Sequence, residues 1–262
     1  MKHSNLILAI CAIALFASSC QKDTLPQQEV SVSFNIGMQQ TKALGDGAAA
    51  TLLSVRVFDA SGAYLFEQTA VRDAAGWDVD LKLVPGTYSF SFWASGQDAD
   101  ACIFENEYMT LSYPRMDMNS DAEDAFWTSL KDCEVTSSFT RSITLKRPFA
   151  LLQLVTDDFI DEPLEGATSA FTITGAIPTR MNLITGEMDQ MARKAIFAPA
   201  SISDYTAGRR TIAAYAYVLA PKEGLSATEV SYSITLSDGR NIEGSAADVP
   251  LTMNHRTTLS DN

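Results

Sequence analysis

The sequence predicts an all-β protein made of two tandem β-sandwich domains, with a short helix in the first. Hydrophobic and polar residues alternate with a period of two along most of the chain, which is typical of half-buried strands. Turn sequences rich in Gly, Pro and Asp separate these short segments at frequent intervals. The chain has 262 residues, and after a leader it divides into two segments of sandwich size, 29–141 and 142–262.

The first strand is expected at residues 30–36, where apolar side chains alternate with Ser and Asn. The apolar positions, which should share one buried face, are Val30, Val32, Phe34 and Ile36. Two hairpins should follow, one turning at residues 59–62 and the other at Pro85-Gly86.

The helix is predicted at residues 120–132, with the sequence SDAEDAFWTSLKD. Ser120 is a good N-cap, acidic residues fill the first turn, and Lys131 lies near the end. Strands are expected again in the second half, where Asp238-Gly239 tolerates positive φ angles and predicts a hairpin turn. Residues 178–204 are expected to form a longer irregular segment.

The first 19 residues have the features of a secretory signal peptide. Lys2 precedes an apolar run at residues 6–16, and three small residues lead to Cys20. The run is too short to span a bilayer, which needs about 20 apolar residues. The stretch LFASSC resembles a bacterial lipobox, which implies acylation of Cys20, for example with palmitate. Ordinary cleavage beside an incidental cysteine is the alternative.

Residues 20–28 are expected to form a lipidated tether. Lys22-Asp23 resembles the export tag of surface lipoproteins of Bacteroidetes, which implies an outer-membrane location facing the cell exterior. The composition, 46% hydrophobic and 19% charged, indicates a globular chain. The net charge of −13 argues against nucleic acid as a partner.

Two cysteines remain after the signal peptide and the lipidation site. An even number of cysteines in an exported protein favours a disulfide, here between Cys102 and Cys133. Two buried free thiols are the competing interpretation.

The chain resembles the fimbrillin-like lipoproteins of Bacteroidales, which include type V pilin subunits. Besides the lipobox, the resemblance is carried by TKALGDGAAATLLSVRVFDASG, by ITLKRPFALLQLVTDD and by VPLTMNHRTTL. It implies two sandwiches of transthyretin-like, Greek-key topology. It also implies a role in cell adhesion or fimbria assembly, with other fimbrial subunits as partners.

In polymerising members of this family, a trypsin-like protease releases the first strand, and a strand from another subunit fills the groove. The corresponding segment here is 29–37, with the apolar residues of the first strand as the groove-filling side chains. The matching processing site is Lys42, because Arg56 lies inside the next expected strand. The alternative is a chain that keeps this strand and never assembles.

No enzymatic activity, metal or cofactor is expected. Beyond the signal peptide the chain has one histidine, His255, and lacks metal-binding, Walker and Rossmann motifs. The acid clusters at 121–124 and 157–162 are interpreted as solvated surface groups.

The alternative to assembly is a monomeric surface lipoprotein for glycan binding or nutrient capture. Tyr113 and Trp127 lie in the less regular region and are candidates for stacking on sugar rings. The partners would then be glycans or proteins of host or bacterial surfaces.

Overall fold

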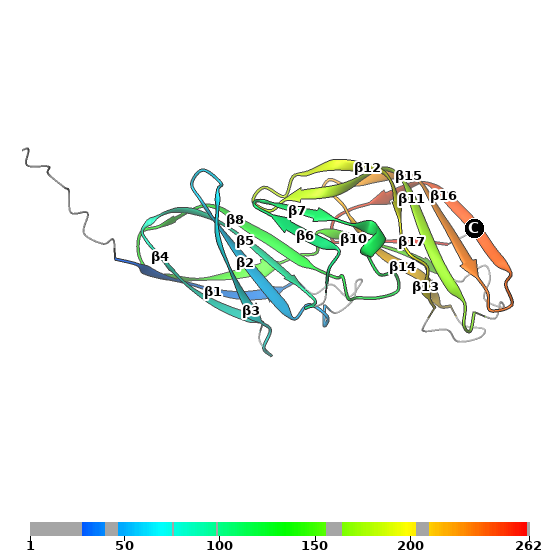
Figure 1. Cartoon of the computed structure of the whole chain (residues 1–262), viewed down its shortest axis with the longest axis horizontal. Helices are drawn as coiled ribbons and strands as arrows, with labels where there is room; N and C mark the ends of the chain where they lie inside the picture. Colours follow the sequence, from blue (N-terminus) through cyan, green and yellow to red (C-terminus); the bar gives the residue numbers. More distant parts are fainter. Residues whose placement is uncertain are drawn as a thin grey trace, which may run out of the picture.

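The computed structural model describes residues 28–39, 47–74, 76–97, 99–155, 164–202 and 210–260. Almost all regular structure is β-strand, as predicted, and the described chain forms two sandwiches placed end to end (Figure 1). The first strand begins at the end of the first sandwich that lies away from the second (Figure 1). A tether attached there would therefore leave the second sandwich farthest from its anchor.

The first sandwich consists of a three-stranded and a four-stranded sheet. The three-stranded sheet has the order β4 (Trp77–Leu83), β1 (Val30–Met38), β9 (Phe139–Leu145). The four-stranded sheet has the order β3 (Tyr64–Val71), β2 (Leu52–Asp59), β5 (Gly86–Ser95), β8 (Phe126–Val135). Alternating side chains from both sheets fill the space between them.

The second sandwich repeats this connectivity. Its three-stranded sheet has the order β14 (Ile212–Leu219), β10 (Phe149–Val155), β17 (Arg256–Leu259). The facing sheet contains β12 (Met188–Ile196), β11 (Thr168–Asn182), β15 (Leu225–Thr235) and β16 (Asn241–Leu251), and the short β13 (Ala200–Ser201) also pairs with β11. In each sandwich the first strand is central, antiparallel to one neighbour and parallel to the last strand.

A hairpin inserted in the first half of the chain belongs structurally to the second. β6 (Cys102–Glu105) and β7 (Tyr108–Leu111) pair with each other, and β7 then pairs with the end of β11, Arg180 lying opposite Thr110. The domain division at residues 141–142 stays a prediction. β9, which pairs with β1 of the first sandwich, ends at Leu145, and β10, which begins the second sandwich, starts at Phe149.

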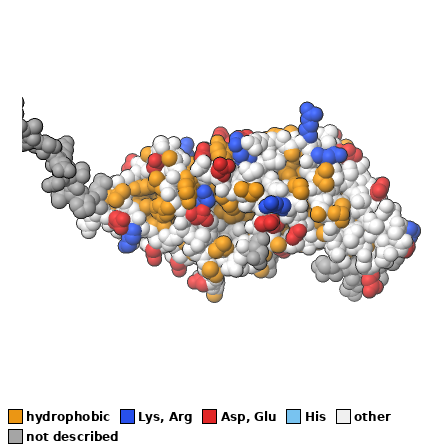
Figure 2. All heavy atoms as spheres, viewed as in Figure 1, with side chains coloured by type: hydrophobic (Ala, Val, Ile, Leu, Met, Phe, Trp, Pro, Cys, Tyr) orange, Lys and Arg blue, Asp and Glu red, His pale blue; other side chains and the backbone are white. Residues whose placement is uncertain are grey.

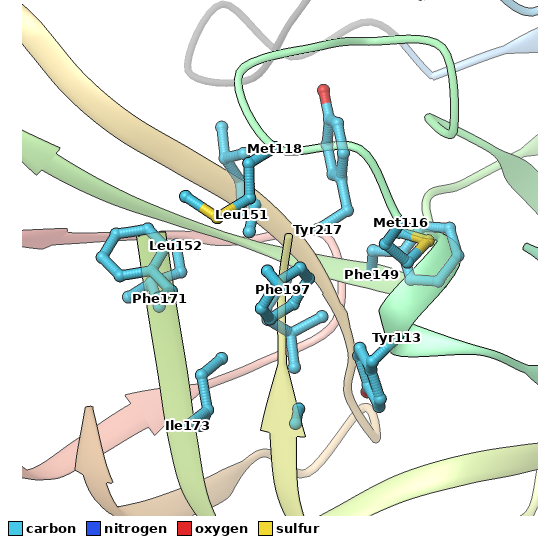
Figure 3. Close-up of a cluster of buried hydrophobic side chains, with 14 of the residues drawn as sticks. Tyr113, Met116, Met118, Phe149, Leu151, Leu152, Phe171, Ile173, Phe197 and Tyr217 are labelled. Atoms are coloured by element: carbon cyan, nitrogen blue, oxygen red, sulfur yellow. The ribbon is translucent and has the colours of Figure 1, made fainter. Parts of the chain in front are cut away.

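Each sandwich has its own hydrophobic core. In the first, Phe34 meets Phe90 and Phe92 edge-on, with ring centroids 5.1 Å and 4.9 Å apart. The second core is larger and includes aromatic, aliphatic and Met side chains from β10, β11, β14 and the segment after β7 (Figure 3). Burial of this apolar surface is the main force that holds the strands together.

Two of the three predicted hairpin turns are confirmed. The chain reverses between β2 and β3 at Gly62, and between β15 and β16 at Gly239. Their φ angles are 84° and 86°, values that glycine adopts without strain. The hairpin predicted at Pro85-Gly86 is wrong, because β4 pairs with β1 in one sheet whereas β5 pairs with β2 and β8 in the facing sheet.

Two other predictions of local structure are wrong. The predicted helix at 120–132 is instead a turn that leads into β8, because residues from Phe126 onward pair with β5, Trp127 lying opposite Trp93. The structure has a short 3₁₀ turn at Tyr113–Arg115. The segment predicted to be irregular, 178–204, is described as far as residue 202, and this part forms the end of β11, all of β12 and the short β13.

We expect Gly76→Ala to destabilise the first sandwich by at least about 2 kcal/mol, since strained backbone positions carry costs of this order. Gly76 has a φ of 137°, and an added Cβ would lie 2.2 Å from the carbonyl oxygen of Ile36 in β1. Urea unfolding measures the effect. Gly37→Ala is the matched control, because nothing lies within 4 Å of its added Cβ, and equal losses for both variants would contradict this prediction.

Candidate functional site

The first candidate site is β1 together with the groove that it fills. β1 is the central strand of its sheet, antiparallel to β4 and parallel to β9. Val32, Phe34 and Ile36 are buried in the first core, and Val30 is partly buried against it. The predicted alternation of β1 is therefore confirmed.

The opposite face of β1 is polar and bonded to β4. The Asn35 side-chain amide donates to Asp78 at 2.6 Å, and the ammonium group of Lys82 donates to Ser31 Oγ at 2.9 Å. β1 is held by backbone hydrogen bonds on both edges and by apolar side chains on one face. Another strand with the same alternation of apolar and polar residues could make the same contacts. Without β1, β4 and β9 would have no partner between them, and a groove lined with backbone N–H and C=O groups would open.

Several predicted residues lie outside the described part of the chain. Cys20, the tether and Lys42 fall in the segments 1–27 and 40–46. Arg56, the basic residue set aside as a cleavage site, is buried in β2 and pairs with Glu67 at 2.5 Å. Its burial agrees with the choice of Lys42 as the processing residue.

The predicted disulfide is wrong. Cys102 and Cys133 are both free thiols. Cys102 lies in β6, which belongs to the sheet of the second sandwich, and Cys133 lies in β8 of the first. Burial raises the pKa of both thiols, which lowers their reactivity.

Tyr113 cannot stack on a ligand as predicted, because it is 3% exposed. Its ring contacts that of Phe197 inside the second core (Figure 3), with a centroid distance of 5.5 Å. Its hydroxyl donates to the carbonyl oxygen of Pro178 at 2.9 Å. The less regular region around Tyr113 therefore serves as core, not as an exposed binding loop.

Trp127, the other predicted stacking residue, is partly exposed at the junction of the two sandwiches. Its indole N–H lies 3.2 Å from both Ser91 Oγ and the carbonyl oxygen of Leu183. It also lines a hollow of about 710 Å³, which is the second candidate site. Pockets of this size are typical of small-ligand sites.

The junction hollow is formed by five segments of the chain. Trp127 comes from β8, Tyr108 from β7, and Asn182 to Met191 from the β11–β12 hairpin. Residues 221–223, before β15, and Met253, before β17, complete the wall. The sequence pattern identified Trp127 but not the other residues, because they meet only when the second sandwich closes.

The prediction that the acidic residues at 121–124 are solvated surface groups is wrong. Asp124 and Arg147 form a fully buried, two-pronged ion pair with both N–O distances at 2.7 Å. Burial raises the pKa of Asp124 to about 6, although Arg147 acts to lower it. Asp121 accepts a hydrogen bond from the Tyr217 hydroxyl at 2.7 Å, which fixes this turn to β14. The second cluster, 157–162, lies outside the described residues.

Other binding chemistry is limited in the described residues. There, no group of three His, Cys, Asp or Glu side chains is arranged to hold a metal ion. None of the helices in that part of the chain is long and apolar enough to cross a membrane.

The two sandwiches, each with its first strand at the centre of a three-stranded sheet, define an all-β fold class of tandem sandwiches. The chain belongs to a family of unknown function, DUF6562, whose model matches residues 23–262. No curated protein matches the sequence.

Solved structures share this fold. A Bacteroides thetaiotaomicron protein, described provisionally as polysaccharide-binding (DUF1812), has a TM-score of 0.55 and 14% identity and covers 82% of this chain and 79% of its own. A second protein of that organism, described provisionally as an adhesin, has a TM-score of 0.53 and 14% identity over 85% and 81%. The fimbrial anchor protein Mfa2 from Porphyromonas gingivalis has a TM-score of 0.49 and 15% identity over 82% and 82%. The predicted fimbrillin-like resemblance is confirmed at the level of the fold.

Proposed function

We propose that this chain is a surface-exposed, lipid-anchored subunit of the outer membrane that acts in adhesion or fimbria assembly by β-strand exchange. The position of β1 carries the proposal, because β1 is both the first strand of the described chain and the centre of its sheet. A cut after Lys42 would separate β1 from β2 in sequence, so that noncovalent contacts alone would hold it. An incoming strand of the same alternation could then replace it through ladder hydrogen bonds and matching side chains.

We expect a trypsin-like protease to convert the protein from a monomer into larger species, or into a form that captures an added strand. The probe is a labelled peptide with the sequence of residues 29–38. Capture would be measured by fluorescence anisotropy, and oligomers by size-exclusion chromatography with light scattering. The peptide should bind only after cleavage, because intact β1 occupies the groove.

Lys42→Gln is the matched control, since it removes the proposed cleavage site by changing a single side chain. A peptide with Phe34→Asp tests the side-chain pocket, because a carboxylate there would be buried without a partner. If the cut protein keeps β1, remains monomeric and ignores the peptide, the chain does not exchange strands.

The lipid anchor has a separate test. Mass spectrometry of the protein from membranes should find an acylated Cys20 at the mature N-terminus, and Cys20→Ala should move the protein into the soluble fraction. An unmodified residue 20 would contradict anchoring and leave the strand-exchange experiment unaffected.

A further inference from the structure

We propose that the junction hollow is a binding site for a neutral oligosaccharide. This function goes beyond strand exchange and does not depend on it, because the site is complete within one chain. The hollow lies where β8 of the first sandwich meets the β11–β12 hairpin of the second. It therefore exists only when both sandwiches are in place.

The hollow combines apolar and polar groups in the way that sugars require. Aromatic and thioether side chains provide surfaces for the C–H faces of a pyranose ring. These side chains are Tyr108, Trp127, Met188, Met191 and Met253. Met191 is half exposed, at 51%, so that part of this surface faces solvent.

The polar groups of the hollow can bond sugar hydroxyls. Asn182, Glu187, Lys222 and Glu223 provide an amide, two carboxylates and an ammonium group. Arg180 and Asp189 neutralise each other, with N–O distances of 2.6 Å and 2.5 Å. Two carboxylates beside one ammonium group disfavour an anionic ligand, which points to a neutral polyhydroxyl compound.

The walls of the hollow are fixed before any ligand binds. Gly186 lies directly against the indole of Trp127, where an added Cβ would be 2.7 Å from the ring, and its φ is 75°. The Arg180 guanidinium covers the Tyr108 ring at 4.3 Å, and its pair with Asp189 holds it there. Preorganised walls lower the entropic cost of binding.

The test is an array of neutral oligosaccharides, followed by calorimetry with any sugar that the protein retains. We expect binding to at least one neutral sugar and a loss of affinity of about tenfold or more in Trp127→Ala, as for a packed aromatic anchor. Glu223→Gln should weaken binding about threefold through a poorer hydrogen bond. Lys42→Gln should bind normally, which separates this site from strand exchange.

Matched controls lie outside the hollow. Tyr64→Ala removes an aromatic side chain that is 37% exposed on β3, and Glu165→Gln alters an exposed carboxyl, so neither should change binding. If Trp127→Ala does not fold, the variants Met191→Ala and Glu223→Gln, which change exposed side chains, test the site instead. Both should bind the sugar more weakly than the unaltered protein. Retention of no neutral sugar, or equal binding by all hollow variants, would overturn the proposal.

Discussion

Phe34→Ala should lower the free energy of unfolding of the first sandwich by about 3–5 kcal/mol, the usual cost of truncating a buried Phe. Phe34 is fully buried in the middle of β1. Its ring contacts the rings of Phe90 and Phe92 on the facing sheet. It also meets the ring of Phe139 on β9, with a centroid distance of 6.3 Å. The truncation would leave a cavity among three rings that neighbouring strands hold in position.

Urea unfolding monitored by circular dichroism measures this loss. Asn35→Ala is the control on the same strand, since Asn35 is exposed and the change removes only its bond to Asp78. We expect that control to cost less than about 1 kcal/mol. A Phe34→Ala loss as small as that of the control would mean that β1 does not hold the two sheets together.

Arg147→Met should destabilise the protein by about 3–5 kcal/mol, because it leaves the buried carboxylate of Asp124 without its charge partner. Both side chains are at most 1% exposed. Arg147 also lies over the Phe126 ring at 4.5 Å, which ties the segment between the sandwiches to the start of β8. Unfolding should be measured at pH 8, above the pKa of about 6 that Asp124 has beside Arg147, so that the carboxyl is ionised in the intact pair.

Removal of both charges should cost much less than removal of one. The variant Asp124→Leu/Arg147→Met contains neither charge of this pair, and such replacements are often neutral. Arg180→Met is the comparison, because Arg180 and Asp189 form an ion pair of the same two-pronged geometry with side chains that are 26% and 50% exposed. This change should lower the free energy of unfolding by about 1 kcal/mol or less. If the double variant loses as much stability as the single substitutions of Asp124 and Arg147 lose together, the two residues act independently.

Local patterns in the sequence were sufficient for most strands and turns. The alternation at residues 30–36 predicted β1 and its buried face, and Asp238-Gly239 predicted the β15–β16 turn. Such features depend on neighbours in the chain, because a strand alternates its side chains and a tight turn requires particular φ angles.

Long-range contacts overrode the local signals in the segment from 98 to 132. Acidic residues there resemble the first turn of a helix, yet pairing with β5 makes residues 126–135 a strand. Trp93 lies on the face of β5 that is directed away from the first core, but it is buried against Phe104 and Phe149 of the second. No local pattern reveals which strands of a second sandwich will cover such a face.

The all-β class, the alternating first strand and the chemical types of the candidate residues could be predicted from the sequence, because they depend on order and spacing along the chain. The folded structure was needed to show that β1 is central, that Tyr113 is core, that Cys102 and Cys133 are free thiols on different sandwiches, and that Trp127 lines a hollow. The reason is that sheet order and the docking of two sandwiches depend on contacts between residues far apart in sequence, which local periodicity does not encode.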